Sequence, residues 1–177
     1  MKPVINLFLL LVSVMSLYSC ALGPIAPAQW RYEKDALTLR VKADRQLNLY
    51  GGKPHTLQLC IYQLKDPNSF NQLIGDEEGL YDLLACTLFD DSVSTTKRFI
   101  IQPGKDLVFT LDRSEGAKYL GIVAGYNTLD GKRMTRLYDI PITMKKKGWF
   151  IQSRYYVPVM LNMDMTLDPQ QIQPIRK

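Results

Sequence analysis

The residue types in this chain offer little for catalysis. The single histidine, His55, follows Pro54 in a predicted loop, and a Ser-His-Asp triad would need partners that this position does not offer. No G-x-S-x-G motif is present. With one histidine and no C-x-x-C motif, a zinc site is not expected either. The sequence therefore predicts a protein that is not an enzyme and that holds no cofactor.

The segment from Gly125 to Lys132 has some of the glycine content of a phosphate-binding loop. Five residues separate Gly125 from Gly131, where such a loop has four, and Arg133 stands where a serine or threonine is required. Asp130-Gly131 is a favoured pair for a two-residue turn. We therefore interpret this segment as the turn of a β-hairpin.

Asn162, Asp164 and Asp168 bring three oxygen-bearing side chains together near the C-terminus. An EF-hand calcium loop needs a central glycine and a late glutamate, and both are missing here. The alternating pattern instead puts Asn162 and Asp164 on the solvent face of a strand. We expect no metal site.

The clearest chemical signal lies in the first twenty residues, which resemble the signal of a lipoprotein. Lys2 is followed by a short and almost wholly apolar stretch, residues 4–15, as in a secretory signal. Leu17-Tyr18-Ser19-Cys20 then resembles a bacterial lipobox. That resemblance implies cleavage after Ser19 and acylation of Cys20, and several acyl chains hold a protein firmly on a membrane. The alternative is an ordinary secretory signal followed by a chance cysteine.

Residue 21 is Ala21, and in lipoproteins of this type the absence of an aspartate there favours the outer membrane. By this resemblance the protein would lie on the periplasmic face of that membrane, held by its lipid. The predicted organisation is a signal peptide at 1–19, a lipidated tether at 20–29, one domain at 30–166 and a flexible tail at 167–177.

The composition is that of a folded domain. The chain has 177 residues, of which 46% are hydrophobic and 22% charged, and no apolar run reaches the length of a spanning helix. The formal charge is +5, but basic residues alternate with acidic ones outside Lys145-Lys146-Lys147. This distribution excludes the basic stripe of a nucleic-acid-binding protein. The lysine triplet is either a solvated hairpin end or a contact with anionic lipid headgroups.

Alternation of apolar and polar residues predicts a β-protein. In the first predicted strand, 37–42, the inward residues are Leu37, Leu39 and Val41. The other predicted strands are 56–64, 97–102, 105–111, 119–126, 134–142, 149–153 and 155–165. Residues 69–89 instead have helical spacing, which predicts a short turn and a helix of about three turns. The expected fold is a two-sheet β-sandwich with a small helical insertion.

Two cysteines, Cys60 and Cys86, remain in the predicted domain. An oxidising compartment would allow them to pair, whereas buried free thiols are equally ordinary core residues. Sequence alone leaves both alternatives open.

The connection from Asp44 to His55 is unusually long for a hairpin. It contains Leu47, Leu49 and Tyr50, followed by two glycines. Apolar residues in a long loop favour a binding function, but Leu47 and Leu49 could equally fold back into the core.

Several segments of the chain are similar to the TssJ (SciN) family, the outer-membrane lipoproteins of the bacterial type VI secretion system. They are Ala43, Asn48, Gly52-Lys53-Pro54, the run Leu57–Lys65 with its Tyr-Gln-Leu ending, Phe70, Leu73, Leu84, Pro103-Gly104 and the strand Tyr119–Tyr126.

The resemblance implies a transthyretin-like β-sandwich without catalytic activity. It further implies that the protein anchors the trans-envelope complex by binding the periplasmic C-terminal region of TssM, the inner-membrane subunit. The contact would be made by the loop between the first two strands. The implied contact residues are Arg45, Gln46, Leu47, Asn48, Leu49, Tyr50, Gly51, Gly52 and Lys53. A lipid-anchored carrier of small ligands is the alternative function, since such sandwiches can hold ligands.

Overall fold

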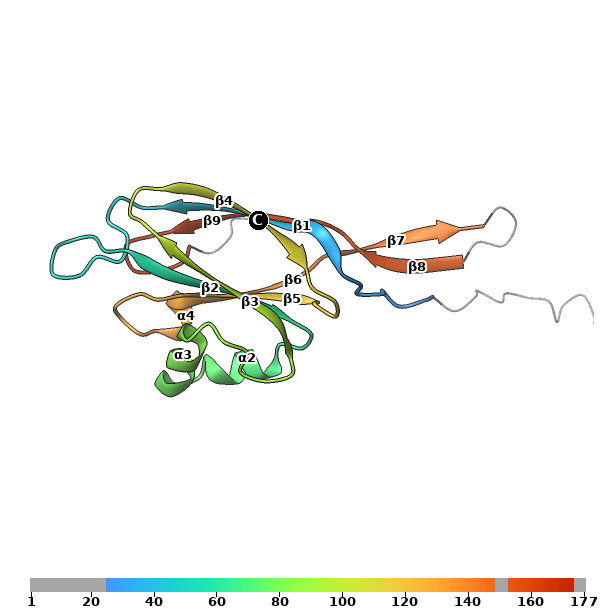
Figure 1. Ribbon diagram of the computed structural model, residues 1–177, viewed down its shortest axis with the longest axis horizontal. Coiled ribbons are helices and arrows are strands. Elements are labelled where there is room, and N and C mark those ends of the chain that lie inside the picture. Colours follow the sequence, from blue (N-terminus) through green and yellow to red (C-terminus); the bar gives the residue numbers. More distant parts are fainter. Residues whose placement is uncertain (1–24, 149–152, 174–177) are drawn as a thin grey trace, which may run out of the picture.

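The computed structural model describes residues 25–148 and 153–173, which form a β-sandwich with a helical insertion (Figure 1). One sheet has the order β4-β1-β9, the other β3-β2-β5-β6, and β7 and β8 form a separate hairpin. The strands are β1 (Glu33–Ala43), β2 (Leu57–Leu64), β3 (Val93–Ile101), β4 (Asp106–Arg113), β5 (Tyr119–Ala124), β6 (Thr135–Asp139), β7 (Ile142–Lys147), β8 (Ser153–Pro158) and β9 (Leu161–Leu167). The helices are α2 (Asn68–Leu73), α3 (Glu77–Leu84) and α4 (Gly131–Met134). None of these described helices is long and apolar enough to cross a membrane.

The core lies between the two sheets, and the predicted inward residues fill it. Leu37, Leu39 and Val41 of β1 are each at most 2% exposed, as the alternation predicted. They pack with the inward residues of β2 and β5 from the facing sheet. Because apolar side chains occupy this space, the two sheets hold each other through the hydrophobic effect.

A second apolar layer covers the outer face of β2. Cys60, Tyr62 and Leu64 point away from the first core and pack with Phe70 of α2 and Leu83 of α3. Strand β2 is therefore buried on both faces, which explains why its sequence is nearly all apolar. Figure 1 shows the two helices below this sheet.

The main helix of the insertion is shorter than the spacing of apolar residues over 69–89 predicted. The carboxylate of Asp76 caps α3 by accepting a hydrogen bond from the Gly79 backbone N–H at 2.7 Å. A Cβ on Gly79 would lie 2.3 Å from the Leu73 carbonyl oxygen, so only glycine allows α2 and α3 to pack this closely. Helix α3 ends after eight residues, about two turns rather than three, and Cys86 beyond it has a φ of 51°.

A disulfide joins Cys60 and Cys86, with 5.4 Å between their Cα atoms. Of the two alternatives that the sequence left open, the structure has the pair rather than the free thiols. The bond ties the residues after α3 directly to the strand beneath.

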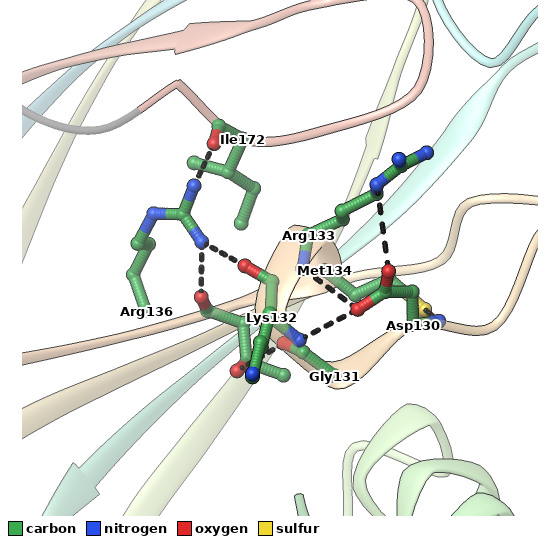
Figure 2. Close-up of polar contacts among 8 residues, drawn as sticks. Asp130, Gly131, Lys132, Arg133, Met134, Arg136 and Ile172 are labelled. Carbon is green, nitrogen blue, oxygen red and sulfur yellow. Dashed lines mark hydrogen bonds and ion pairs between the residues drawn. The ribbon is translucent and has the colours of Figure 1, made fainter.

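The predicted two-residue turn at Asp130-Gly131 is wrong. Strands β5 and β6 do pair antiparallel, but their connection contains the short helix α4. The Asp130 carboxylate accepts hydrogen bonds from the N–H groups of Lys132 and Arg133, at 3.0 and 3.3 Å (Figure 2). Aspartate favours helix N-caps as well as turns, so the local sequence could not distinguish them.

Two predicted strands are each divided in the structure. Residues 134–142 form the end of α4, β6 and the start of β7, and residues 155–165 form most of β8 and most of β9. Proline has no N–H for a ladder, and Pro141 and Pro158 lie at these breaks. Beyond Pro158 the chain leaves the hairpin and joins the three-stranded sheet, where β9 pairs parallel with β1. The predicted strand 149–153 falls mainly on residues 149–152, outside the described residues.

Residues 168–173, which the sequence assigned to a flexible tail, contact the sandwich at several points. Ile172 is fully buried, and its N–H donates to the Arg133 carbonyl at 2.9 Å. Arg136 donates to the Ile172 carbonyl from the other side (Figure 2). The buried Ile172 side chain and these hydrogen bonds together hold a segment rich in proline and glutamine against the sandwich. Residues 174–177 lie outside the described residues.

The start of the domain is fixed by a buried arginine. Arg113 is 3% exposed, and its guanidinium lies 2.7 Å from the Glu33 carboxylate and 5.9 Å from the centre of the Trp30 ring. Trp30 packs against the main core, and its carbonyl accepts from the Gly116 N–H at 2.7 Å. These contacts place Trp30 inside the folded domain.

Candidate partner-binding loop

The connection between β1 and β2 has a base that is packed against the sandwich. The Asp44 carboxylate accepts from the Gln46 N–H at 2.7 Å, and the Asp44 carbonyl accepts from the Leu47 N–H at 3.1 Å. This tight turn directs the Leu47 side chain into the main core, where it is fully buried. Leu49 is half-buried, and its N–H donates to the Pro169 carbonyl at 3.0 Å. The sequence left open whether Leu47 binds a partner or folds back into the core, and the structure shows that it is a core residue.

Asn48 joins the base of the loop to two other segments. Its side-chain oxygen accepts from the Asn127 N–H at 2.8 Å, and its amide nitrogen donates to the Thr56 carbonyl at 3.1 Å. Its φ is 50°, a left-handed conformation that asparagine tolerates better than most residues. The backbone conformation thus favours asparagine or glycine at this position, and the two side-chain hydrogen bonds use its carboxamide.

The tip of the loop, residues 50–55, is exposed and has a defined turn. Tyr50 and Lys53 exchange backbone hydrogen bonds of 2.9 and 3.0 Å. Between them, Gly51 and Gly52 have φ values of 56° and 73°, the positive pair that a type I′ turn requires. A Cβ at either glycine would meet nothing within 4 Å, so the turn stands free in solvent.

The exposed tip presents an aromatic surface. The Tyr50 side chain is 61% exposed, and its ring centre lies 6.3 Å from that of His55. The backbone turn restricts this pair although neither ring is buried. The tip can therefore offer a largely pre-formed apolar contact with little ordering cost.

Arg45 and Gln46 lie at the base but face solvent. They adjoin the turn between β3 and β4, where the Gly104 N–H donates to the Asp44 carbonyl at 2.9 Å. The two loops together line a polar surface depression that includes Lys42 and Asp106.

The nine residues that the family resemblance indicated therefore have two roles. Six are exposed, namely Arg45, Gln46, Tyr50, Gly51, Gly52 and Lys53. Leu47, Asn48 and Leu49 instead form the base that holds the tip. Cys20, the proposed lipidation site, lies outside the described residues.

Sequence reasoning missed the residues that flank this loop. Asn127 and Thr128, after β5, and Pro169 and Gln170, after β9, line a small crevice with Asn48 and Leu49. Behind them the buried Tyr126 hydroxyl donates to the Gln171 carbonyl at 2.7 Å, and burial raises the pKa of this tyrosine. These segments are far apart in the sequence, and no local signal links them.

The described residues show no arrangement suited to catalysis or metal binding. Over 25–148 and 153–173 no group of three or more histidine, cysteine, aspartate or glutamate side chains could hold a metal ion. Asp164, one of the residues considered for calcium, lies 3.3 Å from Arg40 on the exposed face of its sheet.

The loop and the entry of the chain into the domain lie at opposite ends of the molecule. Figure 1 shows the β1–β2 loop projecting from one end of the sandwich, and the N-terminal segment running beside β8 at the other. Among the described residues, the exposed tip of the β1–β2 loop is one surface suited to contact with another molecule.

The family of the chain follows from its sequence. Residues 35–167 match the family T6SS-SciN, described as type VI secretion lipoprotein, VasD, EvfM, TssJ. The chain belongs to this family of TssJ/SciN lipoproteins, and it is a membrane-bound structural lipoprotein of type VI secretion and not an enzyme.

Solved structures agree with this fold. The T6SS lipoprotein TssJ1 from Pseudomonas aeruginosa is 22% identical, with a TM-score of 0.55, covering 82% of this chain and 98% of that one. A structure described as the T6SS protein TssM C-terminal domain from EAEC has a TM-score of 0.58 at 19% identity, over 80% and 98% of the two chains. A structure described as a type VI membrane complex has a TM-score of 0.58 at 19% identity, over 84% and 100%. No curated protein matches the sequence significantly.

Proposed function

We propose that this protein anchors the type VI secretion trans-envelope complex to the outer membrane, and that its β1–β2 loop binds the periplasmic C-terminal region of a TssM-like inner-membrane subunit. Acylated Cys20 supplies the membrane attachment. The observation that carries the proposal is the position of the exposed tip, which lies at the end of the sandwich opposite the entry of the chain (Figure 1).

The length of the tether supports this arrangement. From Cys20 to Trp30 the chain spans at most about 33–36 Å even when fully extended. The end of the domain that holds Trp30 and Ala26 therefore stays near the membrane, and the loop tip faces into the periplasm. An inner-membrane subunit that crosses the periplasm would meet the tip first.

The chemistry of the tip suits a protein contact. Tyr50 is a large side chain with a polar end, a type enriched among the residues that dominate binding energy at interfaces. It stands 61% exposed on a turn whose base is hydrogen-bonded and packed. Lys53 adds a charge at the other side of the same turn.

The contact is tested by measuring binding of the purified periplasmic region of the TssM-like subunit to the wild-type chain and to Tyr50→Ala. We expect Tyr50→Ala to weaken binding by about 10- to 100-fold, the loss typical of an interface anchor. Tyr81→Ala is the matched control, because Tyr81 is 58% exposed but lies on α3, away from the loop. Equal binding by the wild type and Tyr50→Ala, with both chains folded, would overturn the loop assignment.

The anchor is tested separately by fractionating cells that express the wild type or Cys20→Ser. We expect the mass of the wild-type chain to include acyl groups and Cys20→Ser to leave the membrane fraction. The Cys20→Ser chain should still bind the soluble region of the partner, since the loop is unchanged. A wild-type chain without acyl groups would contradict the anchor while leaving the loop contact to its own test.

The alternative of a small-ligand carrier gains no support from the described residues. The space between the sheets is filled by buried side chains. The surface depressions at β8, at β1 and β4, and at the loop base are open to solvent.

A further inference from the structure

The β7–β8 hairpin extends away from the sandwich. Its two strands pair with each other and with neither main sheet (Figure 1). Every residue of β7 is exposed. A two-stranded hairpin is marginally stable alone in water, so a hairpin with this much free surface gains stability from a surface that covers it.

One face of the hairpin combines apolar and cationic side chains. The register pairs Met144 with Tyr156 and Lys146 with Arg154, and alternation puts all four on the same face as Ile142. Ile142 is 47% exposed and Met144 is 45% exposed, so this face presents two neighbouring large apolar side chains to solvent. The apolar part thus adjoins the sandwich, and the cations lie toward the free end.

The charges at the free end have no acidic counterpart. Lys146 and Arg154 face each other directly, and like charges in this position destabilise a hairpin. The sequence contains no aspartate or glutamate between Asp139 and Asp164. None of the ion pairs among the described residues involves the hairpin. An anionic surface would relieve this repulsion.

The course of the N-terminal segment shows which surface is near. Ala26 forms a parallel bridge with Tyr155, through hydrogen bonds of 3.1 Å to the Arg154 carbonyl and 3.2 Å from the Tyr156 N–H. Because the pairing is parallel, the chain reaches Ala26 from the side of the free end of the hairpin. Cys20 is six residues earlier, at most about 20–22 Å of extended chain.

We propose that this face of the β7–β8 hairpin docks on the anionic phospholipid surface of the membrane that carries the lipid anchor. Lys146 and Arg154 bind headgroup phosphates, and Ile142 and Met144 lie against the interface between headgroups and acyl chains. The location rests on the proposed acylation of Cys20. The docking gives the protein a second contact that fixes its orientation, with the β1–β2 loop pointing away from the membrane.

The proposal is tested with the full chain carrying Cys20→Ser, so that acyl chains do not contribute. Its binding is measured by flotation with vesicles of phosphatidylglycerol and phosphatidylethanolamine, and with vesicles of phosphatidylcholine alone. We expect binding to the anionic vesicles that weakens as salt is raised. Adding Lys146→Gln and Arg154→Gln should lower the affinity about 25-fold, from two cations each contributing about fivefold at an anionic surface.

A matched control separates the hairpin from overall charge. Lys42→Gln with Lys105→Gln also removes two cations, but at the end of the sandwich near the β1–β2 loop. We expect this control to bind as the parent does. All variants share the same N-terminal residues, so any contribution from those residues is common to them.

The apolar half of the face is tested by Ile142→Ser with Met144→Ser, for which we expect weaker binding at equal salt. Circular dichroism confirms that each variant is folded. Absence of binding to anionic vesicles, equal binding to neutral ones, or an equal loss in the Lys42/Lys105 control would each overturn the proposal. These outcomes leave the acylation of Cys20, measured by the mass of the wild-type chain, unaffected.

Discussion

Asn48 and Asn127 are joined by a 2.8 Å hydrogen bond between a side-chain oxygen and a backbone N–H, across 79 residues of sequence. This bond connects the loop after β1 to the segment after β5. It helps to hold the exposed tip of a long connection, residues 44–56, in one position. The base of the tip is thus shared with a neighbouring loop.

Replacing Asn48 should therefore loosen the loop base. Asn48→Ala removes two side-chain hydrogen bonds and leaves an alanine at a φ of 50°. We expect a loss of about 2 kcal/mol in the free energy of unfolding, from the bonds and from a left-handed conformation that costs most residues about 1–2 kcal/mol. Urea denaturation measures it. Asn48→Gly is the control, because it loses the bonds without the backbone strain, and a Gly variant as unstable as the Ala variant would contradict the strain argument.

Leu47 and Tyr50 lie three residues apart, yet their substitutions should differ widely in their effect on stability. Leu47→Ala truncates a fully buried side chain, and we expect it to destabilise the domain by about 2–5 kcal/mol. Tyr50→Ala should change stability by less than about 0.5 kcal/mol, because its side chain is mostly exposed. Thermal unfolding of both variants checks this, and a stable Leu47→Ala would contradict its place in the core. Deleting 47–52 is accordingly a poor test of partner binding, since it removes a core residue.

The disulfide should contribute substantially to stability. It closes a loop with a sequence separation of 26 residues. The chain-entropy relation gives about 3–4 kcal/mol for a loop of that size. We expect Cys60→Ala with Cys86→Ala, or reduction of the wild type, to lower the midpoint of thermal unfolding clearly. The double variant should no longer respond to reductant. A wild type whose midpoint is insensitive to reductant would show that the bond is not needed.

Tyr62 should make the domain lose stability at alkaline pH. Burial raises its pKa from 10.0 to about 12, and its hydroxyl donates to the Leu83 carbonyl at 2.5 Å. The unfolded chain loses this proton above about pH 10 while the folded chain keeps it, so this contribution to stability is complete below pH 10 and falls as pH rises to about 12.

Tyr62→Phe removes the titrating group and keeps the ring. We expect the variant to be less stable than the wild type near neutral pH, through the lost hydrogen bond, and the difference between the two chains to shrink above about pH 10. Denaturation midpoints at several pH values measure that difference. Burial raises the pKa of Tyr126 and Tyr138 as well, but these groups are common to both chains. A constant difference across the alkaline range would contradict the assignment to Tyr62.

Much of the fold could be predicted from local patterns. The pattern of apolar residues shows which side of an element is buried. This holds for the alternation in β1 and β4, the apolar run of β5 and the helical spacing before β3. The predictions were wrong at positions where one residue type is compatible with two different local structures. Asp130 caps a helix instead of starting a turn, and Pro158 ends β8 within a segment that the pattern predicted as one strand.

Local sequence patterns also predicted part of the candidate site. The double glycine and the apolar residues of the β1–β2 loop are visible in the sequence, as is the resemblance of Leu17-Tyr18-Ser19-Cys20 to a lipobox. Nothing local distinguishes Leu47, which enters the core, from Tyr50, which remains exposed.

The sequence alone thus determined the family and the alternation that builds the sandwich, and it marked the β1–β2 loop without separating the base of the loop from its exposed tip. The tertiary structure decided that Cys60 meets Cys86, that Ile172 closes the core and that Asn48 bonds to Asn127. It also brought the N-terminal segment beside the cationic hairpin. Each of these contacts joins segments far apart in the chain. Their stability depends on packing and hydrogen bonds that exist only after the whole sandwich has formed.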